Sequence, residues 1–308
     1  MRRFAPRPSS RSGARGASVA RSGLGSNGRA RALRASSRYA SRVRRWRRSV
    51  LVAASFTVLT ALTQIGGLAL LPAVLLERLG KGRAVLAFAL GYAALFPAVA
   101  VIAPWTGRVR LPCLESEVEA AGGLRPATLW TCALHRSYAT PVAREELGRL
   151  AAAMRDRFPG TETRYLDAGF PFGDGFPLVP HLSHDDGRKV DLALFRSGPA
   201  AVPRGDPARG PLGYFAYEPP RAGEPAPCRG VRSWLRWDLD ALQPFVYRPL
   251  DAERTRAGVE WLAARERVAR MFLEPHLKER LGLESSKVRF QGCQAARHDD
   301  HLHVEFRP

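Results

Sequence analysis

Long apolar stretches dominate the first third of the chain. Residues 50–76 are 27 consecutive positions without a charged side chain, and residues 84–105 are another 22. Each stretch exceeds the ~20 residues that a helix needs to cross a ~30 Å hydrocarbon core. The apolar core of a secretory signal, at roughly 7–15 residues, is shorter than either stretch. The pattern therefore predicts two transmembrane helices within residues 50–105, joined as a hairpin by a tight turn at residues 77–83.

Beyond the second stretch, residues 106–308 alternate between helical and strand periodicities, which indicates one α+β domain. Thr140-Pro141 suits the start of a helix, because threonine caps the first turn and proline is tolerated at its first position. The expected elements are a helix from Thr140-Pro141 onward, helices at residues 253–270 and 274–281, strands at 163–170 and 189–195, and a short strand at 213–218. The last strand lies inside a Gly/Pro-rich insertion at residues 196–232, which is otherwise expected to be loop.

Positive charge is concentrated before the first apolar stretch. Residues 1–49 hold fifteen arginines, no lysine and no acidic residue, and so supply +15 of the formal net charge of +20. Serine, glycine, alanine and arginine dominate this tail, so it buries too little apolar surface to offset the entropy of ordering and is expected to be disordered. Arginines next to a membrane helix, with only Phe4, Tyr39 and Trp46 as aromatic residues among them, favour contact with anionic lipid over nucleic acid. No nucleic-acid partner is expected.

Charge and cysteine usage disagree about the side of the membrane on which the domain lies. Arginine-rich segments stay in the cytoplasm, and two crossings would then return residues 106–308 to the cytoplasm as well. All four cysteines lie in that domain: Cys113, Cys132, Cys228 and Cys293. An even number in one domain favours two disulfides and an oxidising compartment, although four unpaired thiols fit the count equally well.

One of two histidine clusters opens a predicted strand. In "HLSHDDGRKVDLALF", strand alternation places Val190 and Leu192 on one face and Asp191 on the other. A buried aspartate is costly unless it is paired or binds a cation. His184 lies seven residues earlier, and a sharp reversal at Gly187 would bring its imidazole over the Asp191 carboxylate. These two groups could form two corners of a metal tetrahedron.

The second cluster lies on the last predicted strand, "HLHVEF". Alternation directs Leu302 and Val304 toward a core and places His301 and His303 together on the opposite face. His303 would complete a His/Asp/His ligand set with a fourth position left for water, which is the catalytic rather than the structural pattern. His301 could accept the proton of that water. The histidines His181, His276 and His298 are expected at the surface or just outside the ligand set.

No GxSxG nucleophile elbow, P-loop or CxxC motif is present. The segments "SHDDGRKVDLALF" and "DDHLHVEFRP" instead resemble the LAS group of zinc peptidases, which includes the lysostaphin-type and D-Ala-D-Ala metallopeptidases. The forms S-H-x-x-G-x-x-x-D and D-H-x-H-V look most like the penicillin-insensitive murein endopeptidases. The resemblance covers residues 160–195 and 285–308, roughly a fifth of the chain.

The resemblance implies an antiparallel sheet flanked by helices, with Zn2+ bound on one sheet face. By position, it implies that His184, Asp191 and His303 are the zinc ligands and that His301 is the general base. Asp300 lies three residues before His303, so a DxxH arrangement would make Asp300 the base instead.

The resemblance also implies a substrate class, the peptides of peptidoglycan, which lie outside the membrane. We therefore expect a membrane-anchored peptidase whose domain is extracytoplasmic, against the charge rule. Arg188 and Arg297 flank the two motifs and are candidates to bind the carboxylates of such peptides. Hedgehog-like relatives keep this zinc arrangement in binding modules, so a zinc-containing module that binds cell-wall peptide without cutting it is the alternative.

Overall fold

The computed structural model describes residues 26–76, 80–197, 213–236 and 248–308. The chain divides into two compact units, Met1–Leu51 and Val52–Pro308, and helix α1 (Ser26–Thr63) runs from the first into the second. The expected disorder of residues 1–49 differs from the structure at residues 26–49, which are helical. Arginine and alanine, which are frequent there, both favour helix. Residues 1–25 lie outside the described residues.

The first apolar stretch is not one continuous helix. Helix α1 ends at Thr63, Gln64 has a positive φ of 64°, and helix α2 (Gly66–Leu76) begins after Ile65. The Thr63 hydroxyl accepts a hydrogen bond from the Gly66 amide at 2.7 Å. A Cβ atom at Gly67 would collide with α1, so glycine permits the close approach of the two helices at this turn.

The second apolar stretch forms helix α3 (Lys81–Ile102), which continues into the short 3-10 helix η2 (Ala103–Thr106). Among the described residues, Lys81–Thr106 is the one helical segment long and apolar enough to cross a membrane, and α2 is a shorter apolar helix. The predicted pair of spans is therefore found only in part.

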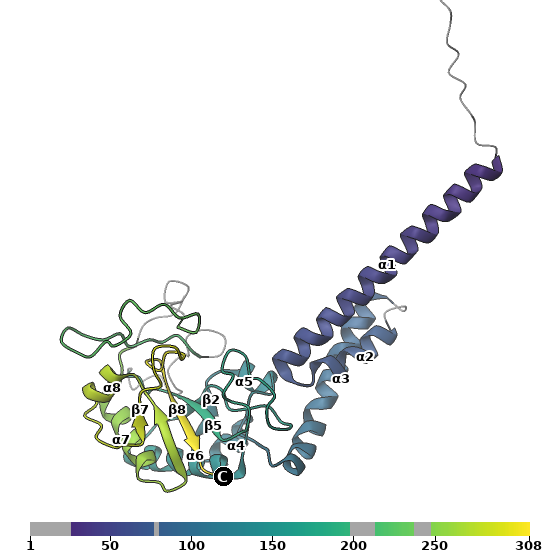
Figure 1. Ribbon diagram of the computed structural model, residues 1–308. Coiled ribbons are helices and arrows are strands. Elements are labelled where there is room, and N and C mark those ends of the chain that lie inside the picture. Colours follow the sequence, from purple (N-terminus) through teal and green to yellow (C-terminus); the bar gives the residue numbers. More distant parts are fainter. Residues whose placement is uncertain (1–25, 77–79, 198–212, 237–247) are drawn as a thin grey trace, which may run out of the picture. The chain divides into compact units, whose positions relative to one another are not determined.

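The domain that follows contains short strands and helices in mixed order (Figure 1). In chain order they are β1 (Val109–Arg110), α4 (Glu115–Ala120), β2 (Leu124–Pro126), α5 (Leu129–Ala133), β3 (Tyr138–Ala139), α6 (Pro141–Arg157), β4 (Thr163–Tyr165), β5 (Lys189–Ala193), α7 (Ala252–Ala263), β6 (Val268–Phe272), α8 (Pro275–Arg280), β7 (Val288–Arg289) and β8 (His301–Phe306). The α+β class is confirmed. The predicted start of α6 is also confirmed, since the Thr140 hydroxyl accepts a hydrogen bond from the Ala143 amide.

Two predicted elements differ from the structure. The helix expected at residues 253–270 ends with α7 at Ala263, and its last residues belong to strand β6. The strand expected at residues 213–218 is irregular chain, in which Phe215 has a positive φ of 75°. Residues 198–212 of the insertion lie outside the described residues.

The main sheet has six strands in the order β2-β4-β5-β8-β6-β7. Its centre is antiparallel, but the edge pairs β2/β4 and β6/β7 are parallel, so the prediction of a purely antiparallel sheet is wrong. Helix α6 lies in the chain between β2 and β4, and α8 lies between β6 and β7. A helical crossover of this kind returns the chain in the same direction and makes the two strands parallel. Strands β1 and β3 form a separate antiparallel pair.

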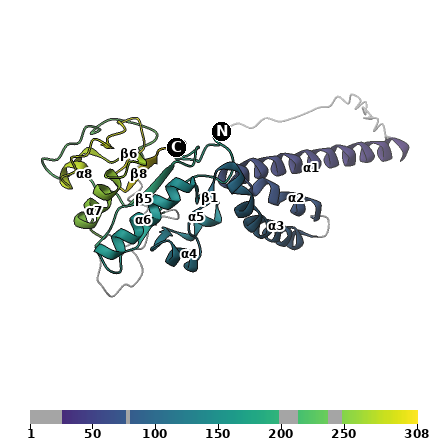
Figure 2. The same cartoon turned by 90° about the horizontal axis from the view of Figure 1, so that it is seen from below.

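Helices α6 and α7 cover one face of the main sheet (Figure 2). The buried side chains Leu147, Leu150 and Met154 of α6 pack in one core with Val190 of β5 and Val304 of β8. The strand alternation predicted from the sequence is therefore confirmed for both strands. The opposite face of β5 and β8 is left for polar side chains.

The four cysteines form two disulfides, Cys113–Cys132 and Cys228–Cys293. The alternative of four unpaired thiols is excluded, because no cysteine is free. The first disulfide joins the chain before α4 to α5. The second joins the insertion to the loop that leads into β8, across 65 residues of sequence.

Candidate metal centre

The pairing of β5 with β8 brings the two histidine motifs together. In this antiparallel pair, Asp191 lies directly opposite His303, and Ala193 lies opposite His301. Residues directly opposite each other project from the same face of a sheet. Asp191 and His303 therefore meet on the face away from α6 and α7, although 112 residues of sequence separate them.

The three predicted ligands converge in a buried cluster. The Nε2 atom of His184 lies 3.2 Å from Oδ1 of Asp191 and 3.1 Å from Nδ1 of His303, and that Nδ1 lies 2.8 Å from the same Oδ1. A tetrahedral ion with bonds of roughly 2.0–2.1 Å separates its ligand atoms by ~3.3 Å. The triangle has nearly this size, so the buried His184, Asp191 and His303 could hold a metal ion as predicted.

A hydrogen bond on the side of the ring away from the cluster fixes the orientation of His184. Its Nδ1 atom donates a hydrogen bond to the carbonyl of Ala168 at 2.7 Å, which directs Nε2 toward the cluster. Such a bond on the far side of an imidazole is typical of metal-binding histidines. The reversal before β5 takes place at Gly187, which has a φ of 66° and lies against Arg108, so the predicted need for glycine at this turn is confirmed.

The second carboxylate oxygen of Asp191 is bound from the other side. Its Oδ2 atom lies 2.6 Å from Nδ1 of His181 and 2.7 Å from the hydroxyl of Tyr214. His301 Nε2 is more distant, at 3.7 Å. His181, Asp191 and His301 also form a group that could hold an ion. Their spacing is uneven and the oxygen already accepts hydrogen bonds, so the first set fits a tetrahedral ion better.

A buried chain of charges extends this network away from the cluster. The Tyr214 hydroxyl also lies 3.0 Å from Oδ2 of Asp167. Both Asp167 oxygens accept hydrogen bonds from the Arg136 guanidinium, at 2.5 and 2.7 Å. The arginine charge holds the pKa of the Asp167 carboxyl below its usual range, although burial alone would raise it. The ion pair keeps Asp167 an acceptor that can anchor Tyr214.

Sequence analysis missed Tyr214, Asp167 and Arg136. A signal for Asp167 was present, since it interrupts the apolar segment "YLDAGF" in the same way that Asp191 interrupts β5. Tyr214 had no such signal, because it was assigned to a strand and its position depends on the irregular path of residues 213–218.

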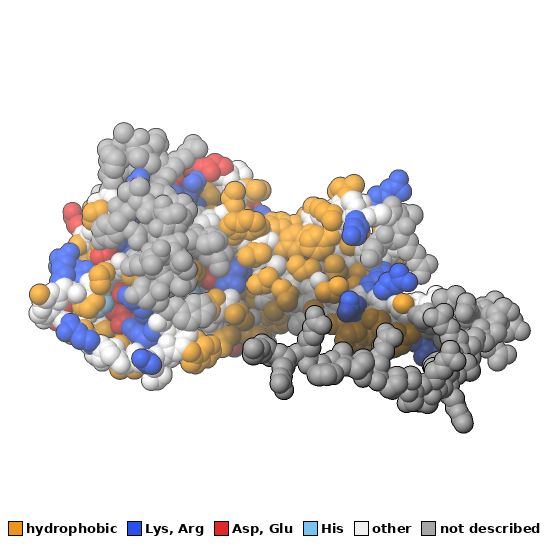
Figure 3. All heavy atoms as spheres, turned by 90° about the horizontal axis from the view of Figure 1, so that it is seen from above, with side chains coloured by type: hydrophobic (Ala, Val, Ile, Leu, Met, Phe, Trp, Pro, Cys, Tyr) orange, Lys and Arg blue, Asp and Glu red, His pale blue; other side chains and the backbone are white. Residues whose placement is uncertain are grey.

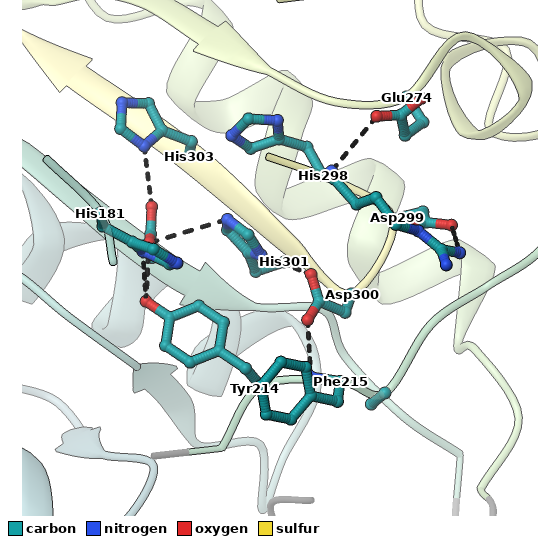
Figure 4. Close-up of polar contacts among 12 residues, drawn as sticks. His181, Tyr214, Phe215, Glu274, His298, Asp299, Asp300, His301 and His303 are labelled. Carbon is teal, nitrogen blue, oxygen red and sulfur yellow. Dashed lines mark hydrogen bonds and ion pairs between the residues drawn. The ribbon is translucent and has the colours of Figure 1, made fainter. Parts of the chain in front are cut away.

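Asp300 and His301 form a second buried pair beside the cluster (Figure 4). Nδ1 of His301 lies 2.5 Å from Oδ1 of Asp300, and Oδ2 of Asp300 accepts a hydrogen bond from the Phe215 amide at 2.6 Å. Both oxygens of Asp300 are thus occupied, whereas Nε2 of His301 faces the cluster. Of the two predicted candidates for a base, His301 is the one with a nitrogen atom, Nε2, that faces the cluster.

The electrostatics of the cluster fit a cation site. Burial opposes charge on His301, but the carboxylates of Asp191 and Asp300 outweigh it and raise its pKa to about 9. Burial alone would raise the pKa of Asp191, but the charges of His184 and His301 hold it well below its usual range. Burial lowers the pKa of His303 to about 4, which favours the neutral form that binds metals.

The remaining predicted residues occupy different environments. His276 and His298 are both buried, so neither lies at the surface. His181 and His298 lie just outside the ligand set, which is the other position expected for them. Nε2 of His276 donates to the Glu218 carbonyl at 2.6 Å. The His298 ring packs near the rings of His301 and His303, with centroids 4.9 and 5.7 Å away.

The two arginines proposed to bind substrate are both paired. Arg188 bonds to Asp186. Arg297 donates to both oxygens of Asp299, and its guanidinium carbon lies 3.7 Å from the centre of the Tyr217 ring. Arg297 lines a cavity of about 220 Å³ that also borders His181, Tyr214, Phe215, Asp300 and His301, whereas Arg188 does not line it.

No protein family model matches this chain, and no curated protein matches it. The chemistry that the site can perform must therefore be judged from its residues. Two imidazoles and one carboxylate, with a third imidazole beside them, are a donor set for a transition-metal ion.

We expect the purified protein to hold about one metal ion per chain, measured by elemental analysis after gel filtration. Replacing either His184 or Asp191 with alanine should abolish this content, because each removes one of three ligand atoms. His276→Gln is the matched control, since its hydrogen bond to Glu218 lies outside the ligand set. Full metal content in both alanine variants would contradict the assignment.

We expect Tyr214→Phe to weaken metal binding about 10–100-fold, because it removes the hydroxyl that holds the outer oxygen of Asp191. Competition with a fluorescent chelator measures this change. Tyr217→Phe is the control, because it keeps the ring that stacks on Arg297. Equal affinity in the two variants would mean that the Tyr214 hydroxyl does not position the ligand.

Proposed function

We propose that this chain is a membrane-anchored zinc metallopeptidase that hydrolyses the stem peptides or cross-links of peptidoglycan. The observation that supports this most is the buried triangle of His184, Asp191 and His303, with His301 directed at it from the same strand. The motif resemblance supports the choice of substrate class.

The ligand set favours zinc among transition metals. Two histidines and one carboxylate, with a fourth position available to water, are the usual arrangement of a catalytic zinc peptidase. Zinc, when bound, acts as a Lewis acid that lowers the pKa of a bound water toward 7. The part of the protein is to hold the three ligand atoms, to exclude bulk water by burial, and to supply a base.

His301 is the proposed general base. Its Nε2 atom points toward the cluster, and Asp300 bonds to Nδ1 and so holds the tautomer whose Nε2 can accept a proton. The carboxylates of Asp191 and Asp300 raise the pKa of His301. A divalent cation next to Asp191 would lower that pKa again, because it disfavours a positive charge on His301, and would so favour the neutral imidazole that a base requires. Asp300 is a positioning residue in this proposal, because both of its oxygens are already bonded.

The cavity next to His301 is the proposed binding site for the peptide. Its aromatic side chains Tyr214, Phe215 and Tyr217 provide an apolar wall, and Asp300 and His301 lie at its inner end. Arg297 also lines this cavity, where its guanidinium packs on the Tyr217 ring and donates to both oxygens of Asp299. We expect it mainly to support Tyr217. A substrate carboxylate could bind to Arg297 only in competition with Asp299. We do not assign Arg188 to the cavity.

The direct test is digestion of purified murein by the full-length protein in detergent, followed by mass spectrometry of the fragments. We expect new peptide ends that disappear with a chelator and return when zinc is added. Retention of the protein on murein without any new peptide ends would support the alternative, a zinc-containing binding module, and would contradict hydrolysis.

We expect His301→Ala to keep its metal and to lose hydrolysis by about 10²–10⁴-fold, the usual contribution of a general base. Asp300→Asn should also keep the metal and lose less activity, because it disturbs only the orientation of His301. Asp299→Asn is the control, since Asp299 is the neighbouring acid but bonds to Arg297. An inactive Asp300→Asn beside an active His301→Ala, both with metal bound, would make Asp300 the base.

A further inference from the structure

The break between α1 and α2 lies against the domain. The side-chain amide of Gln64 donates to the carbonyl of Phe172 at 2.6 Å and accepts from the amide of the same residue at 2.9 Å. Ile65 is buried with Val99, Ala103 and Tyr138. The end of α1 and the start of α2 are therefore fixed at the edge of the domain.

Helix α3 reaches the domain at its C-terminal end. The Thr106 hydroxyl donates to the Pro171 carbonyl at 2.8 Å, and the Tyr92 hydroxyl donates to the Ala133 carbonyl at 2.6 Å. Helices α2 and α3 pack together where Gly91 approaches Pro72. The C-terminal end of α2 and the N-terminal end of α3 are the ends of these two helices that lie remote from the domain (Figure 1).

Three helical segments thus run between the two ends of the apolar layer, where the sequence alone suggested two. Residues 52–63 run toward the domain, α2 runs away from it, and α3 returns to it. This order of passages places the start of α3 on one side of the apolar layer and the domain on the other. We propose that these segments, together with the domain face around α5, form one bilayer-facing surface, with the start of α3 and the domain on opposite sides of the membrane.

The distribution of charge supports this arrangement. Arg44, Arg45, Arg47 and Arg48 come directly before the first passage in the sequence, and the exposed Lys81 and Arg83 begin the third. Lys81 and Arg83 enter the apolar layer at its end remote from the domain. The positive-inside rule assigns that end to the cytoplasm and the domain to the outside. The two disulfides agree, so the conflict between charge and cysteines disappears.

The exposed apolar surface is large and continuous with the domain. Hydrophobic side chains cover much of the helical part of this unit on the face that Figure 3 shows. Exposed hydrophobic residues of α2 and α3 include Leu68, Leu75, Val85 and Leu90. A contiguous apolar surface of this kind, exposed on a single chain, marks contact with a membrane or a partner. Its continuity with α3, the segment that is long enough to cross a bilayer, favours lipid.

The lengths of the segments indicate that the bilayer also reaches the domain. Residues 52–63 and α2 contain 12 and 11 residues, and at 1.5 Å per residue they span only ~16–18 Å of a ~30 Å hydrocarbon core. Helix α5 carries Leu129 and Trp130, 78% and 57% exposed, and its last residue, Ala133, accepts the hydrogen bond from Tyr92 of α3. Trp105, 82% exposed, lies in η2 directly after α3. Tryptophan is enriched at membrane interfaces. The α5 face is therefore assigned to the outer leaflet.

Cysteine labelling in the full-length protein tests the sidedness, because all four native cysteines are paired. We expect an impermeant maleimide to label Glu284→Cys, on the domain, in intact spheroplasts. Gly82→Cys, near the start of α3, should be labelled only after permeabilisation. Both sites are exposed. Labelling of both from the same side would overturn the three-passage arrangement.

Spin labels in proteoliposomes test the position of α5. We expect Leu129→Cys and Leu90→Cys to show high accessibility to oxygen and low accessibility to a water-soluble nickel complex, and Glu284→Cys to show the reverse. If Leu129→Cys is accessible to water while Leu90→Cys is exposed to lipid, α5 does not contact the bilayer. If Leu90→Cys is accessible to water, the proposed bilayer-facing surface is wrong as a whole. These positions lie outside the metal cluster, so murein hydrolysis by the same variants tests the proposed function separately.

Discussion

The register between β5 and β8 is the constraint on which the site depends. Asp191 lies opposite His303 only because Val190 and Val304 also lie opposite each other and are buried on the other face of the sheet. A shift of one residue would turn the polar side chains into the core and the valines out of it. The hydrophobic contacts under α6 and α7 therefore hold Asp191 and His303 opposite each other, where their side chains meet at 2.8 Å.

The Gly/Pro-rich insertion contributes residues to the site. Two consecutive residues of the insertion bind the two carboxylates of the centre. Tyr214 bonds to Asp191, and the amide of Phe215 bonds to Asp300. The disulfide Cys228–Cys293 ties the same insertion to the loop before β8. Asp191, Asp300 and the cavity wall are thus connected through one irregular segment.

Local patterns were sufficient to predict that His184, Asp191 and His303 lie together. Period-two alternation decides which face Asp191 and His303 occupy, and the turn at Gly187 brings His184 to them. The parallel strand pairs at the two edges of the sheet could not be predicted this way, since they depend on how α6 and α8 connect the strands of each pair across the sheet. Tyr214 was missed because the path of an irregular segment is set by distant contacts. Gln64 was overlooked as a helix break because it is uncharged, and its role depends on two hydrogen bonds to Phe172.

The two oxygens of Asp191 serve different partners, with Oδ1 facing the ligand triangle and Oδ2 accepting from Tyr214 and His181. If the triangle holds a metal ion, its occupancy and the order of the insertion are linked equilibria. By thermodynamic reciprocity, a change at Tyr214 that tightens metal binding would then let the metal stabilise the insertion by the same free energy. A molecule that fills the neighbouring cavity would contact Tyr214 and Phe215 and would so change the affinity for the ion. That affinity would then depend on the insertion as well as on three side chains.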